Sequence, residues 1–203
     1  DVEAIRASLG LDRFVLLGHS VGGLVAQSYA ARYGEHLAGL VLCCTVAVFD
    51  FGAEVFEALA RKATPGQMES VTRYFTAGPA DDDEMRRLSA DLVPLYLAGA
   101  APDLARRIVD GTTFRAAANR HFGATVFASF DSRSWLGSVA VPTLVLDGAD
   151  DVVFPPAKGG DRLWALLPDA RHVVLDGCGH FPFAERLEAF WAALRSFLES
   201  LSR

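Results

Sequence analysis

The most constraining feature of the sequence is the segment Gly18-His19-Ser20-Val21-Gly22, which directly follows the apolar run from Phe14 to Leu17. The apolar run predicts a buried β-strand, and the glycines after it predict a sharp turn into a helix that begins at the serine. Such a turn holds the serine in a strained backbone conformation and presents its hydroxyl to solvent. We expect a side chain at position 18 or 22 to collide with the neighbouring helix or strand.

This arrangement favours Ser20 as a nucleophile. A serine held in this way can attack a carbonyl carbon, while the backbone N–H of Val21 donates to the oxygen that becomes negative. The pattern also arises by chance, and Ser20 would then be only the N-cap of the helix. Candidate partners that follow in the order Ser, Asp, His favour the nucleophile.

A second apolar run, from Val141 to Leu146, predicts a strand buried on both faces, and aspartates cluster at its end. Asp151 is the preferred triad acid because it lies three residues past Gly148, at the C-terminal end of the strand. Asp150 is the second candidate and Asp147 the third. Aspartates in such clusters also serve as solvated turn formers, and this alternative stays open.

A third apolar stretch, at 173–175, predicts a short strand that ends in a glycine-flanked loop carrying His180. Open α/β sheets place their sites at the C-terminal ends of strands, which favours His180 as the base. His172 precedes this strand and is therefore predicted at the opposite end of the sheet. A helix is predicted from about 182 to 201, and its predicted buried face consists of Leu187, Phe190, Trp191, Leu194, Phe197 and Leu198.

The three residues together predict a serine hydrolase. His180 would accept the proton of Ser20 during attack and return it to the leaving group. Asp151 would fix the imidazole tautomer and stabilise the imidazolium. The first product is then an acyl-enzyme, which water hydrolyses.

A further buried strand is predicted at 39–43, and the segment between it and the strand at 141–147 contains no clear strand pattern. Apolar spacing instead predicts helices over 52–63, 65–76, 82–98, 102–110 and 113–129. Pro94 is expected to kink or interrupt the third of them. We therefore predict an α/β fold with a core at 1–47 and 137–203, and an all-helical cap at 48–136. The predicted pocket residues, at or just past strand ends, are His19, Phe49, Phe154 and Phe181.

The motifs together resemble the α/β-hydrolase fold superfamily. They are the elbow Gly18 to Gly23, the stretch Val141-Pro142-Thr143 through Asp151, and Gly179-His180-Phe181. More narrowly, the stretch from the elbow through residues 30–37, and the run at 130–136, resemble the proline iminopeptidase-like hydrolases, and esterases and lactonases share these features. The resemblance implies a mostly parallel sheet flanked by helices, a cap that shapes the substrate pocket, and neither a cofactor nor a metal.

The resemblance has one large departure. Members of this superfamily carry several strands before the elbow and a His-Gly-rich loop that supplies a second oxyanion N–H. We therefore expect this chain to be the C-terminal part of a longer polypeptide. The chain itself would then lack one oxyanion donor, a loss of about 2.7–4 kcal/mol of transition-state stabilisation. The strand at 13–17 would expose an apolar edge. The isolated 203-residue chain is then expected to be poorly soluble or inactive.

Composition excludes several other classes. The net charge of −6 without a basic stripe argues against binding to nucleic acid or to anionic membrane surfaces. No apolar run reaches about 18 residues, so no membrane span is predicted. Cys43, Cys44 and Cys178 have no metal-binding spacing and are predicted to be buried thiols of a reducing compartment, which favours a cytoplasmic location.

The predicted substrate is a small ester, lactone or amide, or a short peptide. An aminopeptidase would need a buried cap carboxylate to pair with the free amine of its substrate. The candidates are Glu54, Glu57, Glu69, Asp91, Asp103 and Asp110. A non-catalytic, ligand-binding member of the fold is the alternative from another class. Dehalogenase or epoxide hydrolase chemistry resembles enzymes with an aspartate at the elbow, and Ser20 argues against it.

Overall fold

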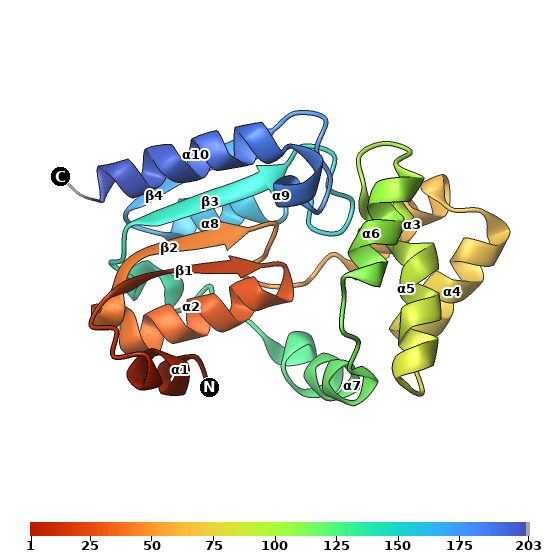
Figure 1. The fold of residues 1–203 in the computed structure, drawn as a ribbon, viewed down its shortest axis with the longest axis horizontal. Helices are drawn as coiled ribbons and strands as arrows, with labels where there is room; N and C mark the ends of the chain where they lie inside the picture. Colours follow the sequence, from red (N-terminus) through yellow and green to blue (C-terminus); the bar gives the residue numbers. More distant parts are fainter. Residues whose placement is uncertain (202–203) are drawn as a thin grey trace.

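The computed structural model describes residues 1–201 as a parallel four-stranded sheet with helices on both faces (Figure 1). The strands lie in chain order, and each pairs in parallel with the next. This confirms the predicted α/β class. The strands are β1 (Phe14–His19), β2 (Leu37–Cys43), β3 (Thr143–Gly148) and β4 (Ala170–Leu175).

Alternating side chains of the buried strands face two separate cores. Leu40 and Leu42 of β2 pack toward α2 (Val21–Tyr33) and α8 (Gly160–Leu166). Val41 of β2 packs toward α10 (Leu187–Ser200) on the opposite face. Because β2 and β3 are covered on both faces, these strands are apolar along nearly their whole length. A short helix, α1 (Val2–Ser8), precedes β1.

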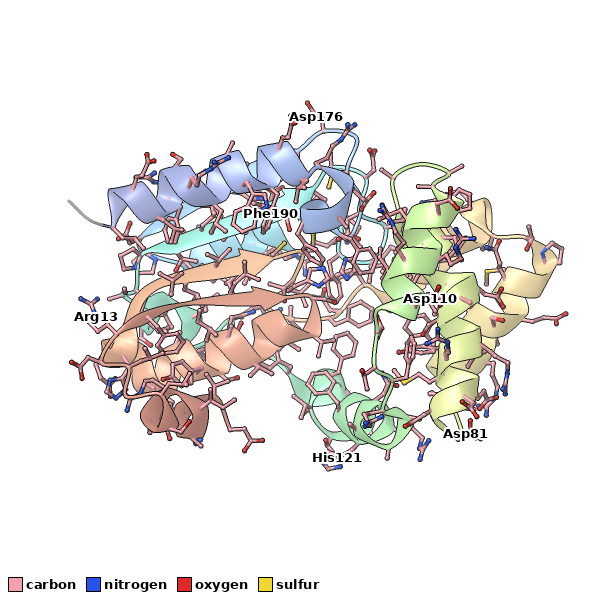
Figure 2. The ribbon with its side chains drawn as sticks, viewed as in Figure 1. Arg13, Asp81, Asp110, His121, Asp176 and Phe190 are labelled. Carbon is pink, nitrogen blue, oxygen red and sulfur yellow. The ribbon has the colours of Figure 1, made fainter. Side chains whose placement is uncertain are left out.

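The C-terminal helix differs from its prediction in two ways. It is divided into α9 (Pro182–Glu185) and α10 by Arg186, whose backbone is not helical (φ −133°, ψ 53°). Its buried stripe contains Phe190, which packs between α10 and the sheet (Figure 2), together with Leu194 and Phe197. The other three predicted members are exposed, because one lies at the first position of α10 and two lie one position off the stripe. They are Leu187, Trp191 and Leu198.

Helices replace strands between β2 and β3, as predicted, and they lie beyond the carboxyl ends of the strands (Figure 1). Thr64 begins one of them with a capping box, its hydroxyl accepting from the N–H of Gln67. The prediction that Pro94 interrupts its helix is wrong, since α5 continues through it and ends two residues later at Tyr96. The helices are α3 (Gly52–Lys62), α4 (Pro65–Thr76), α5 (Asp82–Tyr96), α6 (Pro102–Asp110) and α7 (Ala116–Thr125).

The segment from Val48 to Asp131, which contains helices α3 to α7 and is called the helical excursion below, leaves the core and returns to it at adjacent points. Val48 and Asp131 form an antiparallel bridge. Next to the bridge, Ser132 donates its backbone N–H to the carbonyl of Ala47 (2.9 Å) and its hydroxyl to Oε1 of Gln27 (2.8 Å). Both side chains are fully buried, so the core itself holds the two ends of the excursion together.

None of the helices found in residues 1–201 combines the length and the apolar character that crossing a bilayer requires. The three cysteines are buried and unpaired, as predicted.

Candidate active site

Ser20 lies at the sharp turn between β1 and α2. Its φ of 55° and ψ of −126° are unusual for a residue with a side chain, which is the strained conformation expected of an elbow serine. The backbone N–H of Ser20 donates to the carbonyl of Cys43 (2.9 Å), and its own carbonyl accepts from the hydroxyl of Thr45 (2.7 Å). The end of β2 therefore holds the turn in place from both sides.

The glycines of the turn differ in importance from the prediction. A Cβ on Gly18 would lie 2.7 Å from the Cβ of Ala26, so the predicted collision is confirmed there. A Cβ on Gly22 would meet nothing within 4 Å, so the prediction is wrong at that position. The close approach occurs instead at Gly23, where a Cβ would lie 2.5 Å from carbon atoms of Thr45. The close approach at the start of α2 is therefore to Thr45, just after β2, and it occurs one residue later than the motif suggests.

The structure brings Ser20, His180 and Asp151 together. The distance from Nε2 of His180 to Oγ of Ser20 is 2.9 Å, and from Nδ1 of His180 to Oδ2 of Asp151 it is 2.7 Å. Since a carboxylate only accepts, Nδ1 carries the proton and Nε2 is free to accept from the serine hydroxyl. The three residues form one continuous chain of hydrogen bonds across 160 sequence positions.

Asp151 is almost fully buried, at 3% exposure, and its second oxygen is also occupied. Oδ1 accepts from the backbone N–H groups of Val153 (2.8 Å) and Phe154 (3.0 Å). Burial alone would raise the pKa of Asp151, but attraction to His180 and the hydrogen bonds lower it below the ordinary value. Asp151 is therefore held ionised next to the imidazole. Asp150, the second candidate, is exposed.

His172 and Asp147 form a separate pair. His172 lies inside β4, opposite Val145, and not before the strand as predicted. Its Nε2 donates to Oδ2 of Asp147 at 2.7 Å, away from the serine. Burial raises the pKa of Asp147 despite this bond, and its Oδ1 is a buried side-chain oxygen without a partner among residues 1–201. Asp147 is thus occupied by a different histidine.

His19 supports the histidine loop from the end of β1. Its Nε2 lies 2.6 Å from the carbonyl oxygen of His180 and donates to it. Burial, reinforced by His180, lowers the pKa of His19 to about 4, so its ring is neutral at pH 7. Its ring also packs against Phe181, with centroids 5.5 Å apart. His19 thus contacts the backbone of His180 and the side chain of the next residue.

Aromatic rings connect the candidate triad to the cap. Phe154 contacts the ring of His180 edge-on at 5.5 Å, and Phe49 lies 6.0 Å from Phe154. Two further rings were not among the predicted pocket residues. Tyr96 lies edge-on to His180 at 5.8 Å, and Phe127 packs on Phe49 at 4.8 Å. Both come from the helical excursion, and periodicity does not tell which cap side chains reach the sheet.

The predicted oxyanion donor, the backbone N–H of Val21, lies at the start of α2. Val21 is the first residue of this helix, and the first N–H groups of a helix have no partner within it. These groups also carry the positive end of the helix dipole, which favours a negative oxygen nearby. The backbone N–H of Val21 is therefore available at the position that the elbow motif predicts.

Ligand atoms of His19, Cys44 and His180 lie within 4.8 Å of one another. Each histidine is already engaged, since both nitrogens of His180 and Nε2 of His19 are in hydrogen bonds. Burial raises the pKa of the Cys44 thiol well above its ordinary value, which opposes the thiolate that a metal requires. Metal binding here would have to compete with the serine–histidine–aspartate chain.

Comparison with known proteins agrees with this architecture. The model of the alpha/beta hydrolase fold family matches residues 1–187. The chain belongs to the alpha/beta hydrolase fold family. Its relatives include peptidases and esterases, which supports a hydrolase.

Two similar proteins and one similar structure illustrate the range of this family. A proline iminopeptidase of Lactobacillus delbrueckii subsp. bulgaricus is 24% identical, over 98% of this chain and 70% of its own length. A pimeloyl-[acyl-carrier protein] methyl ester esterase of Neisseria meningitidis is 30% identical, over 92% of this chain and 70% of its own length. The structure of a thermophilic esterase from Thermogutta terrifontis matches with a TM-score of 0.73 and 28% sequence identity. The match covers 99% of this chain and 70% of the esterase chain.

Proposed function

We propose that this protein is a serine hydrolase that cleaves a small ester through Ser20, His180 and Asp151. The observation that carries the proposal is the continuous hydrogen-bond chain from the serine hydroxyl through the imidazole to a buried, ionised carboxylate. Core residues 1–47 and 137–203 supply these groups, and residues 48–136 form the cap over them.

The proposed reaction begins when Nε2 of His180 takes the proton of Ser20 as its Oγ attacks the substrate carbonyl. The backbone N–H of Val21 donates to the developing oxyanion. Asp151 stabilises the imidazolium that forms, because its lowered pKa keeps it charged. His180 then protonates the leaving group, and a water molecule releases the acid from the acyl-enzyme by the reverse sequence.

The six cap carboxylates argue for an ester over an N-terminal peptide amine. Five of them are exposed, and three of these pair with cations: Glu54 with Lys158, Asp103 with Arg106, and Asp110 with Arg86. The sixth, Asp91, is half-buried and accepts from the hydroxyl of Ser70 (2.6 Å). None of the six is a buried carboxylate waiting for a substrate amine. An aminopeptidase would need one, because a buried ammonium must be paired.

The neighbourhood of His180 favours an apolar acyl group. Phe154 contacts the imidazole edge-on, and Phe49 and Phe127 pack with Phe154 in one aromatic cluster. Polar candidates of the cap are occupied or remote. Asn119 donates to the hydroxyl of Tyr74 (2.9 Å), and His121 is exposed on the outer side of α7 (Figure 2).

A fluorophosphonate probe tests the proposal, because it forms a stable adduct only with an activated serine. We expect labelling of the full-length wild-type protein that disappears in Ser20→Ala and in His180→Ala. Ser28→Ala is the matched control, since Ser28 lies on the exposed side of the same helix and its hydroxyl bonds to the carbonyl of Leu24. Absence of labelling in the wild type would favour a ligand-binding member of the fold.

Substrate class is tested separately with short-chain acyl esters, lactones and amino-acid anilides. We expect hydrolysis of the acyl esters to exceed that of proline anilide. The opposite order would identify a peptidase and contradict the argument from the cap carboxylates.

A further inference from the structure

The carboxylate of Glu185 lies at the centre of a cluster of backbone N–H groups around His180. It accepts from Gly179 on one side of the histidine, with 3.1 Å to each oxygen, and from Phe181 on the other side at 3.0 Å. It also accepts from Ala98 at 2.8 Å, at the end of the cap segment that follows α5. One half-buried side chain thus satisfies both peptide N–H groups that flank the histidine and one from the cap.

The same cap segment contacts the histidine directly. The backbone N–H of His180 donates to the carbonyl of Tyr96 (2.9 Å). Lys62 of α3 holds this segment from the other side, donating to the carbonyls of Leu95 and Leu97 at 2.7 Å each. The histidine loop is therefore bonded to the cap at two successive points, through its own backbone and through Glu185.

Gly179 makes this close approach possible. A Cβ at this position would lie 2.7 Å from the backbone nitrogen of Ala98 and would also collide with the carbonyl oxygen of Tyr96. The two backbones run against each other without space for a side chain. A loop so close to another segment keeps its geometry only if its N–H groups have partners, since an unpaired buried N–H is costly.

From these contacts we infer that Glu185 is a positioning residue for His180, which locks the histidine loop to the end of α5. The inference rests on the proposed catalytic role of His180. Glu185 does not touch the imidazole. It acts by fixing the backbone on both sides of His180, so that Nε2 stays within reach of the Ser20 hydroxyl. A charged carboxylate suits this task because it accepts several N–H bonds at once, and such charge-assisted bonds are the strong ones.

Glu185→Gln is the sharpest variant, because it keeps the size of the side chain but leaves one acceptor oxygen for three N–H groups. We expect the rate of fluorophosphonate labelling at Ser20, corrected for the folded fraction, to fall about 10- to 100-fold, as misplacement of a reacting group does. For a short-chain acyl ester, KM should change little while kcat falls. Glu188→Gln is the matched control, because Glu188 is an exposed acid in the first turn of α10, and its labelling should equal that of the wild type.

A purely structural role would lower thermal stability without changing the labelling rate of the folded molecules. The Nδ1 proton resonance of His180 separates the two roles, since we expect it to shift or broaden in Glu185→Gln and to stay unchanged in Glu188→Gln. If Glu185→Gln does not fold, Glu185→Asp carries the same comparison, because it keeps the charge but withdraws the oxygens by one methylene. An unchanged labelling rate and resonance in the folded variant would overturn the inference. A wild type that does not label refutes the proposed function instead.

Discussion

Asp147 of β3 and His172 of β4 form a diagonal pair between neighbouring strands, two residues apart in register, with 2.7 Å between Oδ2 of the aspartate and Nε2 of the histidine. They repeat the pairing of Asp151 with His180, which lie in the loops that follow the same two strands, but His172 lies within a strand and its ring nitrogens contact carboxylates only. Residues 1–201 therefore contain one aspartate–histidine pair within the sheet and one beyond the strand ends, and of these two pairs the second continues to a serine hydroxyl.

The two histidines should separate stability from activity. We expect His172→Ala to destabilise the protein by about 2–3 kcal/mol, because it leaves the buried Asp147 without a partner on either oxygen. The folded variant should still label at Ser20 at the wild-type rate. His180→Ala should abolish labelling, because it removes the proposed base of Ser20. Urea unfolding combined with labelling of the native fraction measures both effects, and loss of labelling in folded His172→Ala would contradict this division.

Asp151 and its neighbour Asp150 offer a test of the proposed triad acid. Asp151→Asn keeps the shape but presents an amide to Nδ1, which favours the wrong imidazole tautomer, so we expect acylation to slow about 10⁴-fold. Asp150→Asn changes an exposed carboxylate and should leave the rate unchanged. Rates of ester hydrolysis by the two purified variants provide the comparison. Equal activity of both would exclude Asp151 as the acid.

The glycines of the elbow should differ sharply in their tolerance of a methyl group. Gly23→Ala forces a methyl group against Thr45, which itself holds the carbonyl of Ser20, so we expect a loss of about 1–3 kcal/mol and slower labelling. Gly22→Ala meets open space and should be neutral, or stabilising by up to about 1 kcal/mol through helix propensity. Thermal unfolding of both variants gives the answer. Equal destabilisation would show that the motif position, and not the contact with Thr45, decides.

His19 gives the protein a dependence of stability on acidic pH. Its folded-state pKa of about 4 lies below the unfolded value of 6.5, so the unfolded chain binds more protons in this range. The contribution of His19 is complete above pH 6.5 and is lost as the pH falls toward 4, about 3 kcal/mol in total. His19→Gln keeps a donor for the carbonyl of His180 but does not titrate. We expect its stability to fall less between pH 6.5 and 4, and parallel curves would disprove the assignment.

Strands β1, β2 and β3 could be predicted from the sequence because each is largely an apolar run, whereas β4 could be predicted only from Val173, since Arg171 and His172 hide its beginning. Even so, β3 begins at Thr143 and not at Val141, since Pro142 precedes it and has no N–H for a sheet ladder. The exposed side of α10 could not be predicted in the same way. Leu187, Trp191 and Leu198 have the composition of a buried face, and only the position of the helix on the sheet determines which stripe is covered.

The residues of the candidate site also differ in whether the sequence predicts them. Ser20, Asp151 and His180 follow strand ends, and parallel topology is sufficient to bring strand ends to one edge. Glu185 and Tyr96 escaped prediction because their contacts depend on where the cap segment after α5 meets the histidine loop. Spacing along the chain carries no signal for an encounter of this kind. The glycine at 179 is a signal only in retrospect, since glycine next to a histidine has many other uses.

The bridge between Val48 and Asp131, backed by Ser132 and Gln27, has a consequence for how such a protein can diversify. The bridge brings the two ends of the segment with helices α3 to α7 together at one point of the core. The core therefore contacts this segment as a unit with a fixed attachment point. Exchanging that segment would leave the paths of β2 and β3 unaltered. A different set of helices could therefore be inserted between β2 and β3, and the substrate preference altered, without moving the strands that position Ser20, Asp151 and His180.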